Sequence, residues 1–141
     1  MPKHLLIVED NEQDLELARV ALELSDVCCE VSVVRDGAEA LDFLYRRGRY
    51  AGRSEGQPDL VLLDLNMPRV SGHEVLCTMH RDEALQRVPV VVISTSKLPG
   101  DRQASEACGV VDYVVKPERF GEFVETINRL GRRWLRLEQS A

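Results

Sequence analysis

The stretch HLLIVED, residues 4–10, decides the fold class of this 141-residue chain. Its first five residues are almost continuously apolar, which is typical of a parallel strand covered on both faces. Glu9 and Asp10 follow directly, where that strand would end. Open α/β sheets bind ligands at the carboxyl ends of their strands, so this acidic pair is expected at a functional edge.

Three further apolar runs carry polar residues at the same end. The runs and the residues that follow them are 59–63 with Asp64, 88–93 with Ser94, and 110–115 with Lys116 and Pro117. If these runs are neighbouring parallel strands, their polar ends meet in one crevice. Such a pocket suits a phosphoryl group and a divalent cation.

Helical patterns lie between the strands. Asn11 is expected to cap the first helix, and the segments 36–39 and 71–74 have the spacing of a capping box. A shorter strand is expected at 30–34, and a fourth helix over about 100–108 should stop at Gly109. Five strand–helix units predict an α/β fold with a doubly wound parallel sheet and right-handed crossovers.

Two segments have more than one interpretation. Residues 46–57 are rich in Gly and Arg and are expected to form a long surface loop, either a solvated insertion or a partner-binding loop. The last helix should begin near Glu118, and its apolar stripe extends to Trp134 and Leu137. That end of the stripe belongs either to the core or to an interface.

Length and charge bound the function. The 141 residues are expected to form a single domain, and the net charge of -6 argues against nonspecific nucleic-acid binding. Without a membrane-length apolar run or a signal peptide, the cytoplasm is the expected location. Four cysteines lack zinc or CxxC spacing and are expected to be small buried side chains in a reducing compartment. They are Cys28, Cys29, Cys77 and Cys108.

The predicted crevice has the chemistry of a phosphoryl-transfer site. Glu9, Asp10 and Asp64 repel one another unless a proton or a cation intervenes, and oxygen-only ligands favour Mg²⁺. The backbone carbonyl of Asn66 is a further candidate ligand. An aspartate can attack phosphorus itself, and Asp64 is the expected nucleophile because it ends the central strand. Lys116 and the Ser94 hydroxyl would bind phosphoryl oxygens.

The ordered set Glu9-Asp10, Asp64 within DLNMP, Ser94 and Lys116-Pro117 resembles the receiver domain of two-component response regulators. The resemblance covers essentially the whole chain. It implies a flavodoxin-like sheet of five strands in the order 2-1-3-4-5. It also implies a signalling domain that catalyses only its own phosphorylation and dephosphorylation, rather than an enzyme for other substrates.

The same resemblance implies roles for individual residues. Asp64 would accept a phosphoryl group from a histidine kinase, with Mg²⁺ or Mn²⁺ held by Glu9, Asp10, Asp64 and the Asn66 carbonyl. Ser94 and Tyr113 would act as the switch, the Lys116–Pro117 bond would be cis, and Asn66 and Ser96 would occupy positions that tune autodephosphorylation.

A narrower resemblance concerns partners. The 46–57 loop and the ending LGRRWL look like stand-alone receivers that serve bacterial phytochrome kinases, so no output domain is expected. In this family the helix around 100–108, the strand 110–115 and the last helix commonly form a dimer or target surface. Four arginines either line this surface or simply form a solvated helix face: Arg129, Arg132, Arg133 and Arg136.

Three alternatives remain open at the level of sequence. A phosphohydrolase with an aspartyl nucleophile usually has a second acid two residues later, where this chain has Asn66. A flavodoxin-like cofactor binder would need a Gly/Ser/Thr-rich phosphate loop after the first strand, where this chain has acidic residues. A receiver-like binding module without phosphotransfer is the third alternative.

Overall fold

A computed structural model of the chain describes residues 3–54, 56–67 and 69–135. The strands are β1 (Lys3–Val8), β2 (Cys29–Val34), β3 (Leu60–Leu63), β4 (Val90–Ser94) and β5 (Asp112–Val115). The helices are α1 (Glu12–Leu24), α2 (Gly37–Tyr45), α3 (Gly72–Arg81), α4 (Pro99–Ala107) and α5 (Phe120–Trp134), with a 3₁₀ turn η1 (Gly48–Tyr50).

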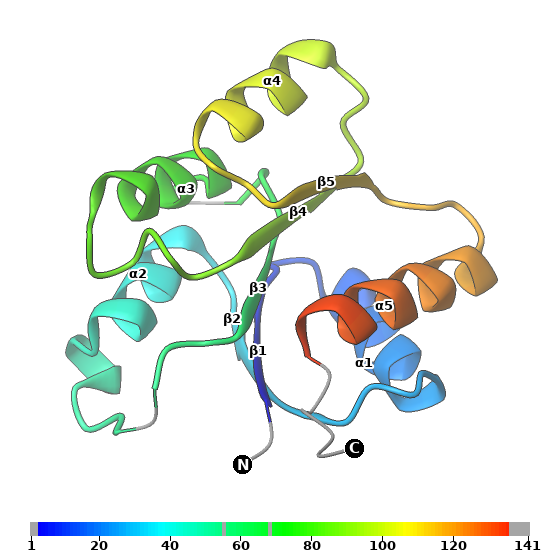
Figure 1. The fold of residues 1–141 in the computed structure, drawn as a ribbon, viewed down its shortest axis with the longest axis horizontal. Helices are drawn as coiled ribbons and strands as arrows, with labels where there is room; N and C mark the ends of the chain where they lie inside the picture. Colours follow the sequence, from blue (N-terminus) through cyan, green and yellow to red (C-terminus); the bar gives the residue numbers. More distant parts are fainter. Residues whose placement is uncertain (1–2, 55, 68, 136–141) are drawn as a thin grey trace.

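The five strands form one parallel sheet in the order β2-β1-β3-β4-β5, which confirms the expected fold class and strand order (Figure 1). β1, β3 and β4 therefore lie at the centre, where their near-continuous apolar runs are buried on both faces. The order reverses between β1 and β3. A crevice is expected outside the carboxyl ends of the strands at such a point.

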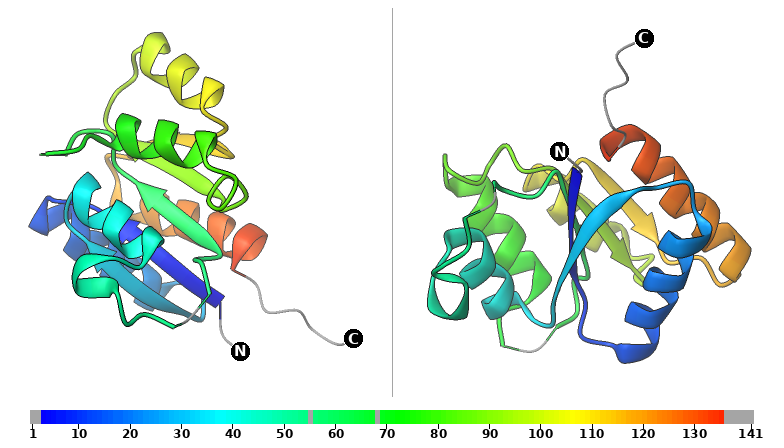
Figure 2. Two further views of the ribbon diagram at one scale, coloured as in Figure 1. Left: turned by 90° about the vertical axis from the view of Figure 1, so that its left-hand side faces the viewer. Right: turned by 90° about the horizontal axis from the view of Figure 1, so that it is seen from below.

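Helices cover both faces of the sheet. α1 and α5 pack on one face, and α2, α3 and α4 lie on the other (Figures 1 and 2). Successive strand residues alternate between two cores, so Leu6 and Val8 pack with α2 and α3, whereas Leu5 and Ile7 pack with α1 and α5. This arrangement leaves the strand ends free to carry polar groups.

The predicted caps begin their helices. Asn11 accepts a hydrogen bond from the backbone of Asp14, Asp36 from Glu39, and Ser71 from Glu74. Each side chain satisfies one of the backbone N–H groups that the first helical turn leaves unpaired. Local sequence is therefore enough to place the starts of α1, α2 and α3.

Several boundaries differ from the expectation. β4 begins at Val90 instead of residue 88, because Val88 donates its N–H to Leu85 and Pro89 has no N–H to donate. Val110 donates to Ser105, so β5 begins only at Asp112. α5 begins at Phe120 instead of near residue 118.

The loop over residues 46–57 is more than a solvated insertion. Arg53 donates from Nε to the carbonyl of Phe43 at 3.0 Å, and its guanidinium lies 4.1 Å from the centre of the Phe43 ring. Gln57 donates to the carbonyl of Leu44, and Tyr50 donates to Glu39. These contacts fold the loop back onto α2.

The C-terminal end of α5 packs partly against the core. Trp134 packs against the α1–α5 core and Leu135 is buried, which favours the core interpretation for the described part of the stripe. Leu137 and Arg136 lie outside the described residues. Among the helices that the structure describes, none is both long and apolar enough to cross a bilayer.

Candidate functional site

Three carboxylates meet at the carboxyl edge of the central strands. Glu9, Asp10 and Asp64 each offer an oxygen within 4.8 Å of the others. Backbone hydrogen bonds to neighbouring strands hold these acids in place. The N–H of Glu9 donates to the carbonyl of Val34, and the N–H of Asp64 donates to the carbonyl of Val8. The sheet thus brings together acids that lie 54 residues apart, as the sequence predicted.

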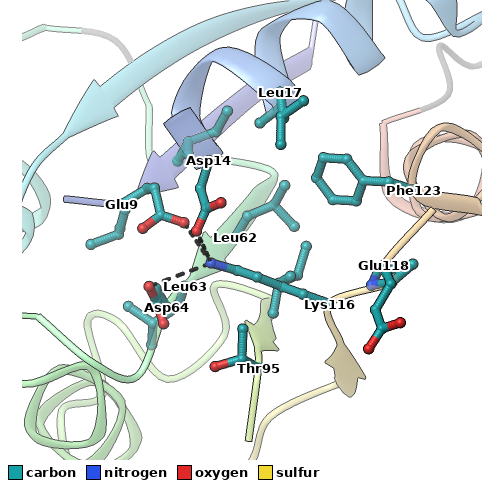
Figure 3. Close-up of a pocket in the computed structure, with 15 residues that line it drawn as sticks. Glu9, Asp14, Leu17, Leu62, Leu63, Asp64, Thr95, Lys116, Glu118 and Phe123 are labelled. Carbon is teal, nitrogen blue, oxygen red and sulfur yellow. Dashed lines mark hydrogen bonds and ion pairs between the residues drawn. The ribbon is translucent and has the colours of Figure 1, made fainter. Parts of the chain in front are cut away.

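Lys116 reaches into this acidic group from the end of β5 (Figure 3). Its Nζ lies 3.0 Å from Glu9 Oε1, 2.8 Å from Asp14 Oδ2 and 3.6 Å from Asp64 Oδ2. The Lys116 and Asp64 side chains are only 17% and 12% exposed, so water screens this attraction weakly. One ammonium group is therefore shared by three carboxylates.

Burial shapes the ionisation of the site. Desolvation raises the pKa of Glu9 to about 7, although Lys116 lowers it, and the nearby Asp64 adds to the rise. Burial lowers the pKa of Lys116, but hydrogen bonds to Asp14 and Glu9 and the charge of Asp64 outweigh that effect and raise it overall. Lys116 is thus firmly cationic, while Glu9 keeps its proton to a higher pH than an exposed glutamate does.

Ser94 and Tyr113 are linked through Ser96. Ser94 is fully buried at the end of β4, and its Oγ accepts the backbone N–H of Ser96 at 3.1 Å. The hydroxyl of buried Tyr113 donates to the carbonyl of Ser96 at 3.0 Å. The backbone of Ser94 also accepts from Lys116 at 2.8 Å. Both predicted switch residues, Ser94 and Tyr113, are therefore hydrogen-bonded to Ser96 in the segment that follows β4.

A pocket of about 280 Å³ opens beside Lys116 (Figure 3). Glu9, Asp14 and Asp64 form its polar end, and Leu17 and Phe123 belong to its largely apolar wall. The pocket lies on the side of Asp64 that faces α1 and α5.

The donor set fits a hard divalent cation. Oxygen ligands of one Mg²⁺ ion, at about 2.1 Å from it, lie at most about 4.2 Å apart. The oxygens of the three carboxylates lie within 4.8 Å of one another, which is close to that limit. A small inward movement of these side chains would bring the oxygens within reach of one ion. Asn66 lies beside them, since its N–H donates to Asp64 Oδ1 at 3.2 Å.

One predicted feature is wrong in this structure. The described residues contain no cis peptide bond, so the Lys116–Pro117 bond is trans. The trans form of an X–Pro bond is favoured by about 0.5–1 kcal/mol, so this bond has the intrinsically preferred form. Lys116 still reaches the acids from a trans bond.

Asp14 is the site residue that sequence reasoning missed. It lies in the first turn of α1, where acidic residues are common without any role in a site. It also makes the shortest ion pair of Lys116. The strand-end pattern could not have found it, because Asp14 lies inside α1, which begins at Glu12, and does not directly follow a strand.

The fold and the site define a class: a doubly wound α/β domain with clustered acids, a lysine and a buried serine at its carboxyl edge. A model of the response regulator receiver domain matches residues 5–128. The chain belongs to the response regulator receiver family.

Individual relatives agree with this assignment. Response regulator Rcp1 of Synechocystis is 35% identical over 95% of this chain and 90% of its own length. A phosphorylated cyanobacterial phytochrome response regulator, RcpA, has 39% identity, a TM-score of 0.89 and coverage of 99% and 98% of the two chains. The bacteriophytochrome response regulator RtBRR has 46% identity, a TM-score of 0.83 and coverage of 100% and 85%.

The comparisons also bear on the metal and on the alternatives. One solved structure of Rcp1, at 34% identity and a TM-score of 0.87 over 98% of both chains, contains Mn²⁺. The family assignment does not favour a phosphohydrolase, and position 66, two residues after Asp64, holds an amide instead of a general acid.

Proposed function

We propose that Asp64 accepts a phosphoryl group from a histidine kinase. The observation that carries the proposal is the 3.6 Å approach of Lys116 to Asp64 inside a cluster of three carboxylates. Such a cluster binds a divalent cation, and a cation with a lysine is what a transferring phosphoryl group needs.

The transfer forms one bond and breaks one. A carboxylate oxygen of Asp64 attacks phosphorus, the bond from phosphorus to the kinase histidine nitrogen breaks, and that nitrogen keeps the electron pair. Lys116 then pairs with a phosphoryl oxygen, and the Ser94 hydroxyl donates to another. Catalysis here is mostly positioning and neutralisation of charge.

Mg²⁺ or Mn²⁺ would be held by Glu9, Asp10, Asp64 and the backbone carbonyl of Asn66. When bound, it would offset the negative charge of the carboxylates and of the phosphoryl oxygens. Because Glu9 must be deprotonated to bind it, the burial that raises the pKa of Glu9 couples cation binding to proton release.

The switch runs through residues 94–96. Phosphorylation would draw the Ser94 hydroxyl away from the Ser96 N–H toward the new phosphoryl oxygens, and the segment would carry the Ser96–Tyr113 hydrogen bond with it. Asn66, whose N–H donates to Asp64, and Ser96, which accepts from Tyr113, would tune the lifetime of the aspartyl phosphate.

The proposed partner is a kinase of the phytochrome type. The support is the similarity to RcpA and RtBRR, whose names assign them to phytochromes. A phosphotransfer assay with a purified bacteriophytochrome kinase, followed by a radiolabel on this chain, tests the pairing. Transfer no faster than from an unrelated histidine kinase would contradict it.

We further propose that α4, β5 and α5 form the output surface, as a homodimer or with a downstream protein. Leu98 and Val111 are exposed apolar residues there, and Arg129 lies 3.5 Å from Asp112 across β5 and α5. Sedimentation with and without beryllofluoride measures the oligomer, and Val111→Lys should weaken it. An unchanged oligomer would place the interface elsewhere.

The decisive experiment is intact-protein mass spectrometry after incubation with Mg²⁺ and acetyl phosphate. The native chain should gain one base-labile phosphate, and Asp64→Asn should gain none. Because some receivers ignore small donors, a chain without an adduct is next tested for binding of beryllofluoride with Mg²⁺. Failure of both would leave a receiver-like binding module without phosphotransfer.

A further inference from the structure

Two cysteines that are distant in sequence lie in contact on the face of the sheet opposite α1 and α5. Cys77 belongs to α3, and Cys108 is the residue that ends α4. Their sulfur atoms are 2.9 Å apart although 31 residues separate them. α3 and α4 lie next to each other on this face in both views (Figures 1 and 2).

Packing and backbone geometry hold the pair in place. The backbone N–H of Cys108 donates to Ser105 at 3.1 Å, and the following Gly109 takes a left-handed φ of 77°. Cys108 packs against the core formed with α2 and α3. Both cysteines are nevertheless only partly buried, so a small oxidant reaches them from solvent.

We propose that Cys77 and Cys108 form a reversible intramolecular disulfide when the protein meets a peroxide. A disulfide has an S–S bond of about 2.05 Å, so the sulfur atoms need to approach by less than about 1 Å. Disulfides in reducing compartments are commonly transient and redox-sensing, which suits a pair of this kind.

The oxidation balances with hydrogen peroxide as the only reagent. One cysteine of the pair attacks a peroxide oxygen as its thiolate, the O–O bond breaks, and a sulfenic acid and a hydroxide form. This hydroxide takes the proton that the attacking thiol had released. The sulfur of the other cysteine then attacks the sulfenic sulfur, the S–O bond breaks, and the hydroxide that leaves takes the proton of this second thiol. Two thiols and one peroxide thus give one disulfide and two waters.

The contact between the two sulfurs also affects their ionisation. The hydrogen bond with Cys77, together with burial, raises the pKa of Cys108. Because either sulfur can donate in this contact, either cysteine can attack first, and the other lies within reach to resolve the sulfenic acid.

A bond here would tie the end of α4 to α3. Ser105 is the only buried residue within α4, so little apolar packing holds this helix. The opposite end of α4 contacts the switch segment, because Ser96 donates to Asp101. Arg102 lies 5.8 Å from the centre of the Tyr113 ring. Oxidation would thereby restrain the helix that adjoins Ser94–Ser96.

The test uses the full chain with Cys28 and Cys29 changed to serine, so that only the proposed pair remains. After hydrogen peroxide, its intact mass should fall by two hydrogen atoms, and peptide mapping should join Cys77 to Cys108. Dithiothreitol should restore the original mass. Sulfinic acids without a linked peptide, or linkage only between two chains, would overturn the proposal.

Single variants test the sulfenic acid intermediate. In Cys108→Ser or Cys77→Ser, made in the same background, peroxide with dimedone should label the remaining cysteine of the pair, because no partner is left to resolve its sulfenic acid. Circular dichroism checks that each variant is folded. The absence of a dimedone label in both variants would overturn the proposed route through a sulfenic acid.

Hydrogen exchange tests the effect on α4. Amides of residues 99–107 should exchange more slowly in the oxidised chain than in the reduced chain, and Cys77→Ser should show no such difference. Equal exchange in a chain shown to carry the disulfide would overturn the proposed restraint on α4.

Discussion

Asp14 holds Lys116 through an ion pair of 2.8 Å, which is shorter than the 3.6 Å approach of Lys116 to Asp64. The lysine thus rests against the first turn of α1 before any phosphoryl group is present. A phosphoryl group on Asp64 must compete with Asp14 for the same ammonium group. Asp14 is therefore a positioning residue, and breaking its ion pair with Lys116 adds to the free energy that phosphorylation requires.

We expect Asp14→Asn to speed phosphorylation by acetyl phosphate about three- to tenfold, since releasing a partly exposed ion pair is worth roughly 1 kcal/mol. The measurement is the initial rate of phosphoprotein formation at saturating Mg²⁺. Glu16→Gln, an exposed change on the same helix, is the control. A slower rate in Asp14→Asn would mean that Asp14 prepares Lys116 instead of restraining it.

Glu9 should make the metal-free protein sensitive to pH. Its pKa is about 7 in the folded state, above the ordinary value of 4.5, so between these pH values the folded chain binds more protons than the unfolded chain. The contribution of Glu9 to stability therefore falls as pH rises through that window.

Urea unfolding of the native chain and of Glu9→Gln, both in the presence of a chelator, tests the direction of this pH dependence. The variant should match the native chain near pH 5 and exceed it by on the order of 2 kcal/mol near pH 8. A constant difference at both pH values would show that Glu9 does not titrate in this window. Added Mg²⁺ should stabilise the native chain more at pH 8 than at pH 6.

Gly72 should be intolerant of any side chain. A Cβ there would lie 2.1 Å from the carbonyl oxygen of Asp64 and 2.7 Å from the Cα of Leu65, both backbone atoms. Gly72→Ala should therefore lower the free energy of unfolding by about 2–3 kcal/mol and impair phosphorylation, because it displaces the acceptor.

Gly100→Ala is the matched control, since nothing lies within 4 Å of the added atom in α4. It should raise the free energy of unfolding by about 0.5 kcal/mol, because alanine restricts the unfolded chain. Chemical denaturation compares the two variants. Equal effects would mean that the close contact at Gly72 relaxes without cost.

Arg53 should contribute to stability although it lies in a loop. Its hydrogen bond to Phe43, its bond to Gln57 and its stacking on the Phe43 ring would be lost in Arg53→Ala, costing about 1–2 kcal/mol of unfolding free energy. Arg87→Ala, at an exposed position, should change it by less than about 0.5 kcal/mol. Similar losses in both would indicate a merely solvated loop.

Most of the fold could be predicted because its signals are local. Continuous apolar runs identify buried parallel strands, and Asn11, Asp36 and Ser71 satisfy helix N–H groups wherever the chain goes afterwards. The site residues follow from the same logic, since parallel strands bring their carboxyl ends to one edge.

The sequence by itself determined the sheet, the helix starts and the gathering of Glu9, Asp10, Asp64 and Lys116 at one edge. Only the tertiary structure decided which acid holds Lys116 most closely and that Cys77 meets Cys108. It also decided that Arg53 stacks on Phe43. The physical reason is range: strand and cap preferences act within a few residues, whereas these contacts depend on how helices and loops pack across the sheet.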